Sequence, residues 1–524
     1  MDTKALRQKI LDLAIRGKLV PQDSNDEPAS VLLERIRQQK QQMVKEGKLK
    51  PKDIKNDSVI FVGEDNLHYE KFADDSVKCI EDEIPFELPD GWAWERLSNL
   101  ASFSGGKTPS TSRSEYWDGD ILWVTSKDMK SKYITSSQLR LSTLGAEQMQ
   151  MYQPDTLLLV TRSGILRHTL PVAILKECAT INQDLKAIIL YMPQLAEYIY
   201  VCLKGMETQL LLKYTKSGTT VENVNFDEFQ KVLLPIPPIQ QIDRIMSSTG
   251  SAESVVSTIE DDKAALADYV IKAKSKILDL AIRGQLVPQD PDDEPASVLL
   301  ERIRAEKEEL IKQGKIKRDK KESVIFRGED NSYYLRTEEL VESLEDWDFE
   351  ELPDSWSVCC LGELCDYGNC TNIDTADIAD SAWILDLEDI EKDSGVVLQK
   401  VRQGERNAGS TKHRFHKGQV LYSKLRPYLN KVVLADEDGY CTSEILPLEF
   451  ERNILPQYAR YFLMSPAFLR YANKCSYGVK MPRLGTADGK KAIISVPPVK
   501  EQKRIIMAIE LAFAQLASIA ENLA

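Results

Sequence analysis

Apolar positions recur every seven residues in the middle of this chain, as the core positions of a coiled coil do. One seam runs through Ile245, Ala252, Ile259, Leu266, Ala273 and Leu280, and a second carries Val256, Val270 and Ile277. A matching spacing near the C-terminus runs through Ile509, Phe513, Leu516, Ala520 and Leu523. The pattern predicts two long helices that pack antiparallel as a spacer. The alternative is that each helix packs on its own domain.

Residues 95–236 and 357–496 show another pattern, in which short apolar runs are separated by Gly and Asp turns. Such runs are typical of strands. We expect strands at 121–124, 156–160, 186–190, 419–422 and 431–435, and helices at 194–213 and 457–473. Both segments are therefore predicted to be mixed α/β domains with the same order of elements.

The chain contains an internal repeat. Residues 10–37, ILDLAIRGKLVPQDSNDEPASVLLERIR, recur at 277–304 with 25 of 28 positions identical. The match continues through SVIF, GEDN and LPDGW, and it returns where LPIPPIQQIDRI (234–245) faces ISVPPVKEQKRI (494–505). Each half therefore has a shared entrance, a divergent segment and a shared exit.

The repeat is circular. The first exit continues into the second ILDLAIRG, whereas the second exit stops at Ala524 and its missing remainder stands at residues 1–23. We therefore expect the two chain ends to lie close together. In both copies an aspartate, Asp26 or Asp293, precedes Glu-Pro-Ala-Ser and is expected to be the N-cap of a helix that stops at Gly47 or Gly314.

Composition predicts a folded, soluble, cytoplasmic protein, with 42% apolar and 29% charged residues and no apolar stretch near the length of an uncharged membrane helix. The nine cysteines are an odd number and indicate reduced thiols. A net charge of −14 argues against a nucleic-acid partner. However, residues 237–356 alone carry −11, and both divergent segments are close to neutral.

The second divergent segment contains a basic run. Between Lys400 and Lys431 nine Lys and Arg residues accompany a single acid, Glu405. The cations are Lys400, Arg402, Arg406, Lys412, Arg414, Lys417, Lys424, Arg426 and Lys431, with His413, His416, Tyr422, Tyr428 and Asn430 between them. Such a mixture is typical of a surface that binds phosphates and reads base edges. The alternative is a solvated loop.

The first divergent segment has a weaker equivalent with Arg162, Arg167, His168 and Lys176. Upstream of it, Lys107 lies in the glycine loop SGGKTPS, which lacks the glycine spacing of a P-loop.

The sequence contains few patterns that indicate a catalytic site. Asp155, Asp184 and Lys186 can be fitted to a metal-dependent nuclease pattern of two acids and a lysine, but the second half has Ser443-Glu-Ile-Leu without the lysine. Four clustered cysteines lack the close pairs of a zinc site; they are Cys359, Cys360, Cys365 and Cys370. The chain has no adenine-methylation motif, and we expect neither a catalytic site nor a metal.

Together, these motifs resemble the DNA specificity subunit of type I restriction-modification enzymes. ILDLAIRGKLVPQD with DEPASVLLERIR resembles the conserved region of that family, and PPIQQIDRI and PPVKEQKRI resemble the exits from its target-recognition domains. GQVLYSKLRPYLNK (418–431) resembles a stretch common in those domains.

The resemblance implies an α+β fold with two mixed α/β target-recognition domains in pseudo-twofold arrangement, separated by an antiparallel pair of long helices. The implied division is 1–56, conserved helical region; 57–236, first target-recognition domain; 237–321, second conserved region; 322–496, second target-recognition domain; and 497–524, conserved C-terminal helix. Each recognition domain is expected to read one half of a split, asymmetric double-stranded DNA site, and the helices to set the gap.

The resemblance also implies partners: two methyltransferase subunits that carry S-adenosylmethionine, and motor-nuclease subunits that use ATP and Mg²⁺. This chain is then a non-catalytic subunit without a cofactor or metal of its own. The residues expected to contact DNA are Lys107, Arg162, Arg167, Lys216, Lys412, Arg414, Lys424, Arg426, Asn430, Lys431 and Lys480. Two alternatives are a stand-alone nuclease through Asp155, Asp184 and Lys186, and a scaffold that does not bind DNA.

Overall fold

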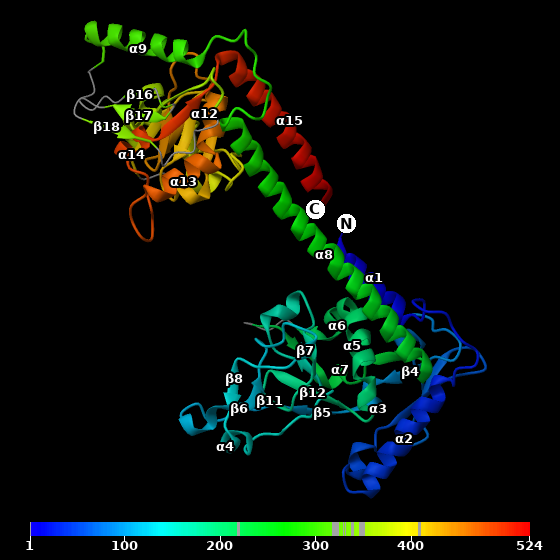
Figure 1. Ribbon diagram of the computed structural model, residues 1–524. Helices are drawn as coiled ribbons and strands as arrows, with labels where there is room; N and C mark the ends of the chain where they lie inside the picture. Colours follow the sequence, from blue (N-terminus) through cyan, green and yellow to red (C-terminus); the bar gives the residue numbers. More distant parts are fainter. Residues whose placement is uncertain are drawn as a thin grey trace. The chain divides into compact units, whose positions relative to one another are not determined.

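The computed structural model describes residues 2–216, 221–316, 324–328, 330, 332–336, 340–344, 352–406 and 410–523. The chain forms two compact units, Met1–Asp262 (unit 1) and Lys263–Ala524 (unit 2). The boundary falls inside α8 (Ile239–Ile282), so that this 44-residue helix contributes one half to each unit (Figure 1). The predicted class, two mixed α/β domains with a long helix between them, is confirmed.

A five-stranded sheet in the order β5-β12-β9-β10-β7 organises the variable segment of unit 1. Its strands are β5 (Ala101–Gly105), β7 (Tyr133–Ile134), β9 (Leu157–Val160), β10 (Val172–Leu175) and β12 (Leu185–Leu190). A second sheet, β11-β6-β8, contains β6 (Trp117–Val124), β8 (Leu139–Leu141) and β11 (Ala179–Ile181). Two strand pairs complete the unit: β4 (Ala93–Arg96) with β15 (Leu233–Ile236), and β13 (Thr215–Lys216) with β14 (Asn223–Val224). The three strands predicted in this segment are confirmed.

The helix predicted at 194–213 is two helices, α5 (Ala196–Gly205) and α6 (Glu207–Tyr214). The break falls at Met206, where α5 packs on α1 (Thr3–Ile15) and Gln8 of α1 donates a hydrogen bond to the carbonyl of Gly205 (2.9 Å). The short helices of unit 1 are α3 (Leu97–Leu100), α4 (Thr143–Ala146) and α7 (Phe226–Phe229).

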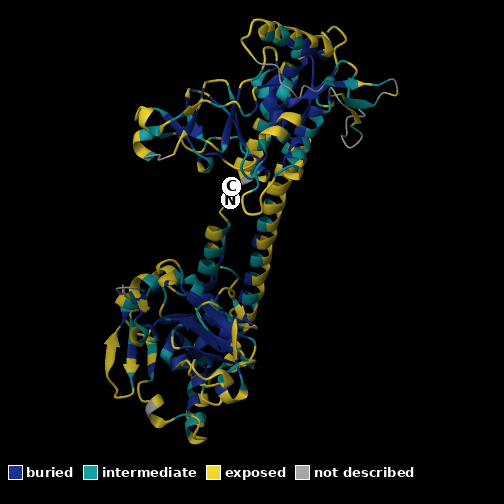
Figure 2. Cartoon of the chain, turned by 90° about the vertical axis from the view of Figure 1, so that its left-hand side faces the viewer, coloured by how far each residue is buried: buried dark blue, intermediate teal, exposed yellow. Residues whose placement is uncertain are grey.

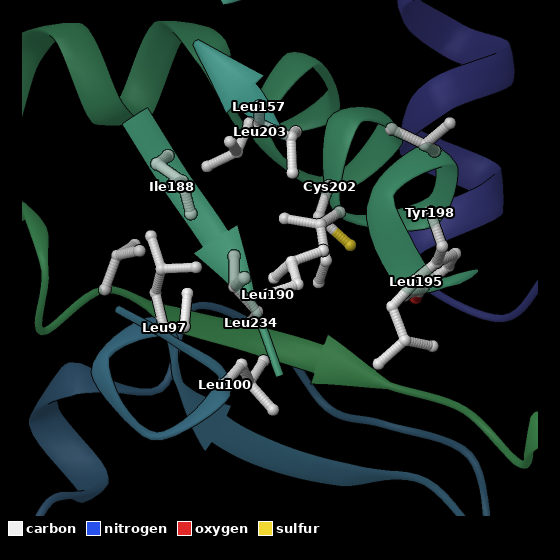
Figure 3. Packing of buried hydrophobic residues seen from close by; sticks show 14 of the residues in the cluster. Leu97, Leu100, Leu157, Ile188, Leu190, Leu195, Tyr198, Cys202, Leu203 and Leu234 are labelled. Carbon is white, nitrogen blue, oxygen red and sulfur yellow. The ribbon is translucent and has the colours of Figure 1, made fainter. Parts of the chain in front are cut away.

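The repeated segment of unit 1 shares a core with the variable segment. Apolar residues of α1 and α2 (Ala29–Lys45), including Ile15 and Leu32, are buried in the same cluster as strand residues. Figure 3 shows Leu157 and Ile188 of the sheet beside Leu203 of α5 in that cluster, and Figure 2 shows buried residues concentrated in the sheets. Because the repeated helices and the sheet share one core, the five-part domain division remains a prediction.

The motifs shared by the two halves meet at one junction in each unit. The indole N–H of Trp92 donates to the side-chain oxygens of Gln22 (3.1 Å) and Gln241 (2.9 Å), and so joins LPDGW to VPQD and to the exit helix. The equivalent residues of unit 2 are Trp356, Gln289 and Glu501, linked at 3.0 and 2.6 Å. In both halves the three shared motifs thus contact one another.

The N-cap prediction for Asp26 is wrong. α2 begins after Pro28, which is the N-cap, and the Asp26 carboxylate instead forms an ion pair with Arg244 on α8. The corresponding residues of unit 2 are Asp293, Pro295 and Arg504, with an ion pair of 2.6 Å. The guanidinium is a stronger partner for the carboxylate than a helix N–H, so the aspartate holds the exit helix. The predicted glycine stops are confirmed: α2 and α9 (Ala296–Lys312) end just before Gly47 and Gly314, both with positive φ.

Each unit contains an antiparallel helix pair. In unit 1, Arg7 of α1 contacts Glu260 of α8 at 2.5 Å. In unit 2, Lys274 of α8 lies 5.6 Å from the ring centre of Phe513 on α15 (Val499–Leu523). Leu266, predicted on the heptad seam, is 43% exposed, so the seam is not continuously buried. Packing of the two long helices as one spacer, and the proximity of the chain ends, remain predictions.

Unit 2 also contains a five-stranded sheet, a three-stranded sheet and a strand pair, but the order of the strands differs. Its five-stranded sheet, β20-β23-β26-β21-β22, contains β20 (Asn372–Ile373), β21 (Trp383–Leu385), β22 (Val401–Arg402), β23 (Lys412–Phe415) and β26 (Gly439–Thr442). The others are β25-β24-β27, made of β24 (Val420–Ser423), β25 (Val432–Leu434) and β27 (Ile445–Leu448), and the pair β19 (Ser357–Cys360) with β28 (Ile493–Val496). The strands predicted near 419–422 and 431–435 are confirmed.

The helix predicted at 457–473 is also divided, into α12 (Pro456–Leu463) and α13 (Pro466–Lys474). Pro466 cannot donate a helical hydrogen bond, and the Ser465 side chain caps α13 by accepting from the N–H of Phe468. The short helices of unit 2 are α10 (Leu361–Leu364), α11 (Gln403–Arg406) and α14 (Thr486–Lys491).

A small antiparallel sheet precedes each variable segment. In unit 1 its strands are β1 (Ser58–Val62), β2 (His68–Phe72) and β3 (Val77–Cys79), and in unit 2 they are β16 (Val324–Arg327), β17 (Tyr333–Arg336) and β18 (Val341–Ser343). In unit 1 the inner face carries a buried ion pair between Glu70 and Arg96 (2.7 Å), and Arg96 also binds Glu83 (2.8 Å). This ion-pair network fastens the small sheet to β4.

The network makes unit 1 sensitive to acid. Burial would raise the pKa of Glu83, but hydrogen bonds from Arg96 and Lys78 outweigh it and lower this pKa from 4.5 to about 2. A carboxylate with a depressed pKa in the folded state contributes stability above its unfolded pKa and loses it as the pH falls towards the folded value. We therefore expect the free energy of unfolding of the wild type to approach that of a Glu83→Gln variant as the pH falls from about 5 to about 2. Urea unfolding across this range measures the difference, and a difference independent of pH would contradict the assignment.

One helix in the described part of the chain, α15, is long and apolar enough to cross a membrane by length and composition alone. The composition had predicted that no stretch approaches this length. Glu510 and Glu521 interrupt the apolar sequence of this helix, and its residues Ile505 and Ile509 are buried in the core of unit 2. A single helix of this kind is weak evidence of a membrane span, since core helices pass the same test.

Candidate nucleic-acid interface

Two hairpin loops carry half of the basic residues expected to contact DNA. In unit 1 the loop joins β9 to β10, and in unit 2 it joins β24 to β25. The loops begin alike: the N–H of Thr161 donates to the carbonyl of Asp184 (2.8 Å), and the N–H of Lys424 donates to that of Glu444 (3.0 Å). The two loops therefore occupy equivalent places in the two units.

A second hairpin lies against the loop in unit 1. The N–H of Val224 donates to the carbonyl of Thr161 (2.9 Å), and the N–H of Ser163 donates to that of Glu222 (3.2 Å). β13, which contains Lys216, pairs with β14 in this hairpin.

Unit 2 has the same arrangement. The N–H of Leu484 donates to the carbonyl of Lys424 (3.0 Å), and the N–H of Arg426 donates to that of Pro482 (2.7 Å). Pairing of Tyr477 with Arg483 closes the second hairpin, which contains Lys480. Residues far apart in the sequence are thus brought together at one edge of each unit.

The unit 1 candidates are all exposed. Lys107, Arg162 and Lys216 have exposed side chains, and the N–H of Lys107 donates to the carbonyl of Ile181 (3.0 Å), three residues before Asp184. Arg167 is exposed but forms an ion pair with Glu222; its hydrogen bond lowers the pKa of that carboxyl. Arg167 thereby ties the loop to the second hairpin while presenting part of its guanidinium to solvent.

In unit 2 the exposed candidates are Arg414 and Lys480, whereas Lys424 and Arg426 are half-buried. Arg426 has a left-handed backbone (φ 50°), which is uncommon for a residue other than glycine. Asn430 is left-handed as well (φ 49°), on the other side of the turn Pro427–Leu429. Strained residues held by their surroundings concentrate at functional sites.

Three candidates in unit 2 have internal partners, which argues against the predicted direct contacts. Lys412 is 4% exposed and forms an ion pair with Asp386 (3.1 Å). The Asn430 side chain is buried and donates to the carbonyl of Met464 (3.1 Å), so it fastens the loop to the end of α12. The Lys431 ammonium donates to the carbonyl of Leu387 (2.6 Å), and burial lowers its pKa. Asn430 and Lys431 therefore connect the end of the loop to α12 and to Leu387, whereas Lys412 of β23 is paired outside the loop.

In the folded chain, acids from other segments neutralise part of the positive charge of the basic run. Lys400 binds Asp436 (2.7 Å), Arg402 binds Glu437 (2.8 Å), and Arg406 binds the buried carboxylate of Asp389 (2.5 Å). These acids lie outside the run, so a count of neighbouring residues could not include them. His413 is buried, its Nδ1–H donates to the carbonyl of Ile445 (2.9 Å), and burial lowers its pKa. Of the unit 2 candidates, Arg414, Lys424, Arg426 and Lys480 keep side chains that are at least partly accessible to solvent.

The second hairpin of unit 2 carries exposed apolar residues that the sequence patterns missed. Tyr477 is 62% exposed, Val479 101% and Met481 49%. Arg483 anchors the hairpin through hydrogen bonds to both carboxylate oxygens of Glu444. The signal in the sequence was the Tyr-Gly turn followed by alternating apolar and basic residues, of which only Lys480 had been singled out.

The structure separates the residues of the nuclease alternative. β9 and β12 are antiparallel, so Asp155, before β9, and Asp184, before β12, lie at opposite ends of the strand pair. About six extended residues separate the two positions, roughly 20 Å. Asp155 binds Lys176 (3.1 Å), and the Lys186 ammonium lies 5.6 Å from the ring centre of Phe226. In the described part of the chain, no group of three or more His, Cys, Asp or Glu could hold a metal ion.

The sequence profile described as the type I restriction modification DNA specificity domain matches residues 89–252 and 353–519, which is more than half of the chain. The specificity subunit of the type I restriction enzyme EcoAI from Escherichia coli is 29% identical over 421 residues, which cover 70% of this chain and 63% of that protein. The specificity subunit of EcoEI from Escherichia coli is 27% identical, covering 69% and 61%. The matches therefore span less than two thirds of the length of these relatives.

Among solved structures, the HsdS subunit from Thermoanaerobacter tengcongensis is similar over 84% of this chain and 94% of its own, with 15% identity and a TM-score of 0.39. This distant likeness adds nothing to the assignment. The profile matches one stretch in each unit, and each stretch includes the second hairpin and the exit. The chain therefore belongs to the family of type I restriction modification DNA specificity domains.

Proposed function

We propose that this chain is the sequence-specific DNA-binding subunit of a type I restriction-modification complex. In this proposal each unit reads one half of a bipartite, asymmetric DNA site, and the long helices set the spacing between the halves. The chain itself catalyses no reaction, and it acts in the cytoplasm.

One observation carries the proposal: the two units build the same pair of loops and equip it with different side chains. Arg162 follows the shared backbone contact in unit 1, whereas Lys424 makes that contact in unit 2. A common backbone with different hydrogen-bonding groups is what reading two unlike half-sites requires, because base identity is read by side chains at the base edges.

The motifs shared by the two halves are proposed to bind partner proteins. We infer that the repeated acidic segments bind two copies of a methyltransferase subunit that carries S-adenosylmethionine, and that motor-nuclease subunits using ATP and Mg²⁺ join the complex. Of the eleven residues first expected at DNA, Lys107, Arg162, Arg167, Lys216, Arg414, Lys424, Arg426 and Lys480 remain proposed contacts. Lys412, Asn430 and Lys431 are proposed as positioning residues.

The test is to co-express the chain with its methyltransferase subunit, determine the stoichiometry, and map methylated adenines by sequencing. We expect two methyltransferase subunits per chain and methylation in a split motif. An Arg162→Gln variant should reduce the base specificity at one half of the methylated motif and leave the specificity at the other half unchanged. Methylation unaffected by deletion of this chain would contradict the proposal, and a chain that cleaves DNA by itself with Mg²⁺ would favour the nuclease alternative.

A further inference from the structure

The outer face of the small three-stranded sheet is the same in the two units. In unit 1 it presents Val59, Phe61 and Val77, which are 39%, 41% and 53% exposed. Phe61 stacks on Tyr69 of the neighbouring strand, with ring centres 5.9 Å apart. The face is therefore an apolar and aromatic surface open to solvent within its unit.

Unit 2 has a similar face, with Val324, Phe326 and Val341 at the positions of Val59, Phe61 and Val77, although Phe326 is half-buried. Phe326 stacks on Tyr334 at 5.7 Å, and Val341 is 53% exposed. The tyrosine hydroxyl is held alike in both copies: Tyr69 donates to Asp65 and Tyr334 donates to Asp330, each at 2.7 Å. A cation follows on the same face in both copies, Lys71 in one and Arg336 in the other.

The inner face, by contrast, keeps Ile60 and Ile325 but has changed at its centre. The buried ion pair of Glu70 and Arg96 in unit 1 is replaced in unit 2 by Leu335 and Cys360, which pack in an apolar cluster. Folding constrains buried residues more strongly than exposed ones, so drift should have been faster outside than inside. An exposed aromatic surface kept in both copies, above an inner face that changed, indicates a binding surface.

The charge around the face favours a protein over DNA. In unit 1 the exposed acids Asp65, Asp74 and Asp75 stand beside two exposed cations, Lys71 and Lys78. In unit 2 the exposed acids Asp330 and Glu342 stand beside Arg327 and Arg336. Residues 237–356, which include the second sheet, carry a net charge of −11. An acidic border repels phosphates and attracts a protein surface with Lys or Arg around an apolar centre. Because the face occurs twice in one chain, its partner binds as two identical copies.

We propose that the outer face of each small sheet docks one methyltransferase subunit, which offers an apolar patch bordered by basic residues. This inference rests on the proposed function and goes beyond it, since both small sheets lie outside the residues matched by the family profile, 89–252 and 353–519. The stacked rings, Phe61 on Tyr69 and Phe326 on Tyr334, form the centre of each contact, as aromatic residues do at most interfaces.

The experiment compares co-purified complexes of the wild type, Phe61→Ser, Phe326→Ser and the double variant by native mass spectrometry and by titration with the methyltransferase subunit. We expect two, one, one and no methyltransferase subunits per chain, with a loss of affinity of at least about tenfold at each altered site. Leu212→Ser is the matched control, because Leu212 is an 81% exposed apolar residue of α6 away from the sheet. It should leave two subunits bound.

A second variant distinguishes a loss of binding from a loss of folding. Val77→Ser changes the same face but leaves the ring stack intact, and it should weaken one of the two sites in the same direction. A double phenylalanine variant that keeps both subunits at wild-type affinity overturns the docking proposal and leaves the proposed function standing. A wild-type chain that binds no methyltransferase subunit overturns both.

Discussion

Replacing Lys424 and Arg426 together by glutamine should weaken DNA binding of the assembled complex about 100-fold, or about 3 kcal/mol. The expectation follows from their position: both lie on the loop of unit 2 that the second hairpin supports, and neither forms an ion pair with another described residue. Loss of each phosphate contact should also lower the salt dependence of binding by about one unit in slope. Fluorescence anisotropy with labelled DNA at several salt concentrations measures both effects.

The matched control is Lys400→Gln with Arg402→Gln, which makes the same change in charge within the same basic run. These two cations already bind Asp436 and Glu437, so their replacement should reduce affinity by less than about threefold. Equal losses in the two double variants would mean that only the total charge matters and that the loop is not a specific site. Unchanged affinity in the first would favour a scaffold that does not bind DNA.

Local and repeated patterns were sufficient to predict much of the fold. Runs of apolar residues placed β9, β12 and β24 correctly, and glycine stops marked the ends of α2 and α9. The repeat indicated two similar units, and its shared motifs proved to be those that contact one another around Trp92 and Trp356. Each of these features depends on neighbouring residues or on comparison of the two halves.

Features that depend on distant partners were not predictable. The local sequence around Asp26 is typical of an N-cap, but its carboxylate forms an ion pair with Arg244, which is more than 200 residues away in the sequence. Lys412 belongs to a basic run and is nevertheless buried against Asp386. The candidate interface was found in part, because the basic loops were evident in the sequence, whereas the hairpin that supports each of them becomes a neighbour only in the folded chain.

Replacing Arg96 by methionine should destabilise the region around the small sheet of unit 1 by about 3–5 kcal/mol. Arg96 is the common partner of Glu70, whose side chain is 5% exposed, and of Glu83. Without the guanidinium, the Glu70 carboxylate stays buried with no opposite charge, and this desolvation cost is larger than the loss of the contact itself. Hydrogen–deuterium exchange of the amides of β2 and β4 in the intact chain measures the free energy of local opening.

Unit 2 suggests a second substitution that should restore the lost stability. There the equivalent positions hold Leu335 and Cys360 in an apolar cluster, so the same small sheet is held without an ion pair. Glu70→Leu combined with Arg96→Met should therefore recover most of the stability lost in the single variant, since replacement of both partners of a buried ion pair by apolar residues is often neutral or stabilising. A double variant no more stable than Arg96→Met would show that unit 1 requires the charge network itself. Recovery would show instead that an apolar contact can hold the small sheet of unit 1 as the ion pair does.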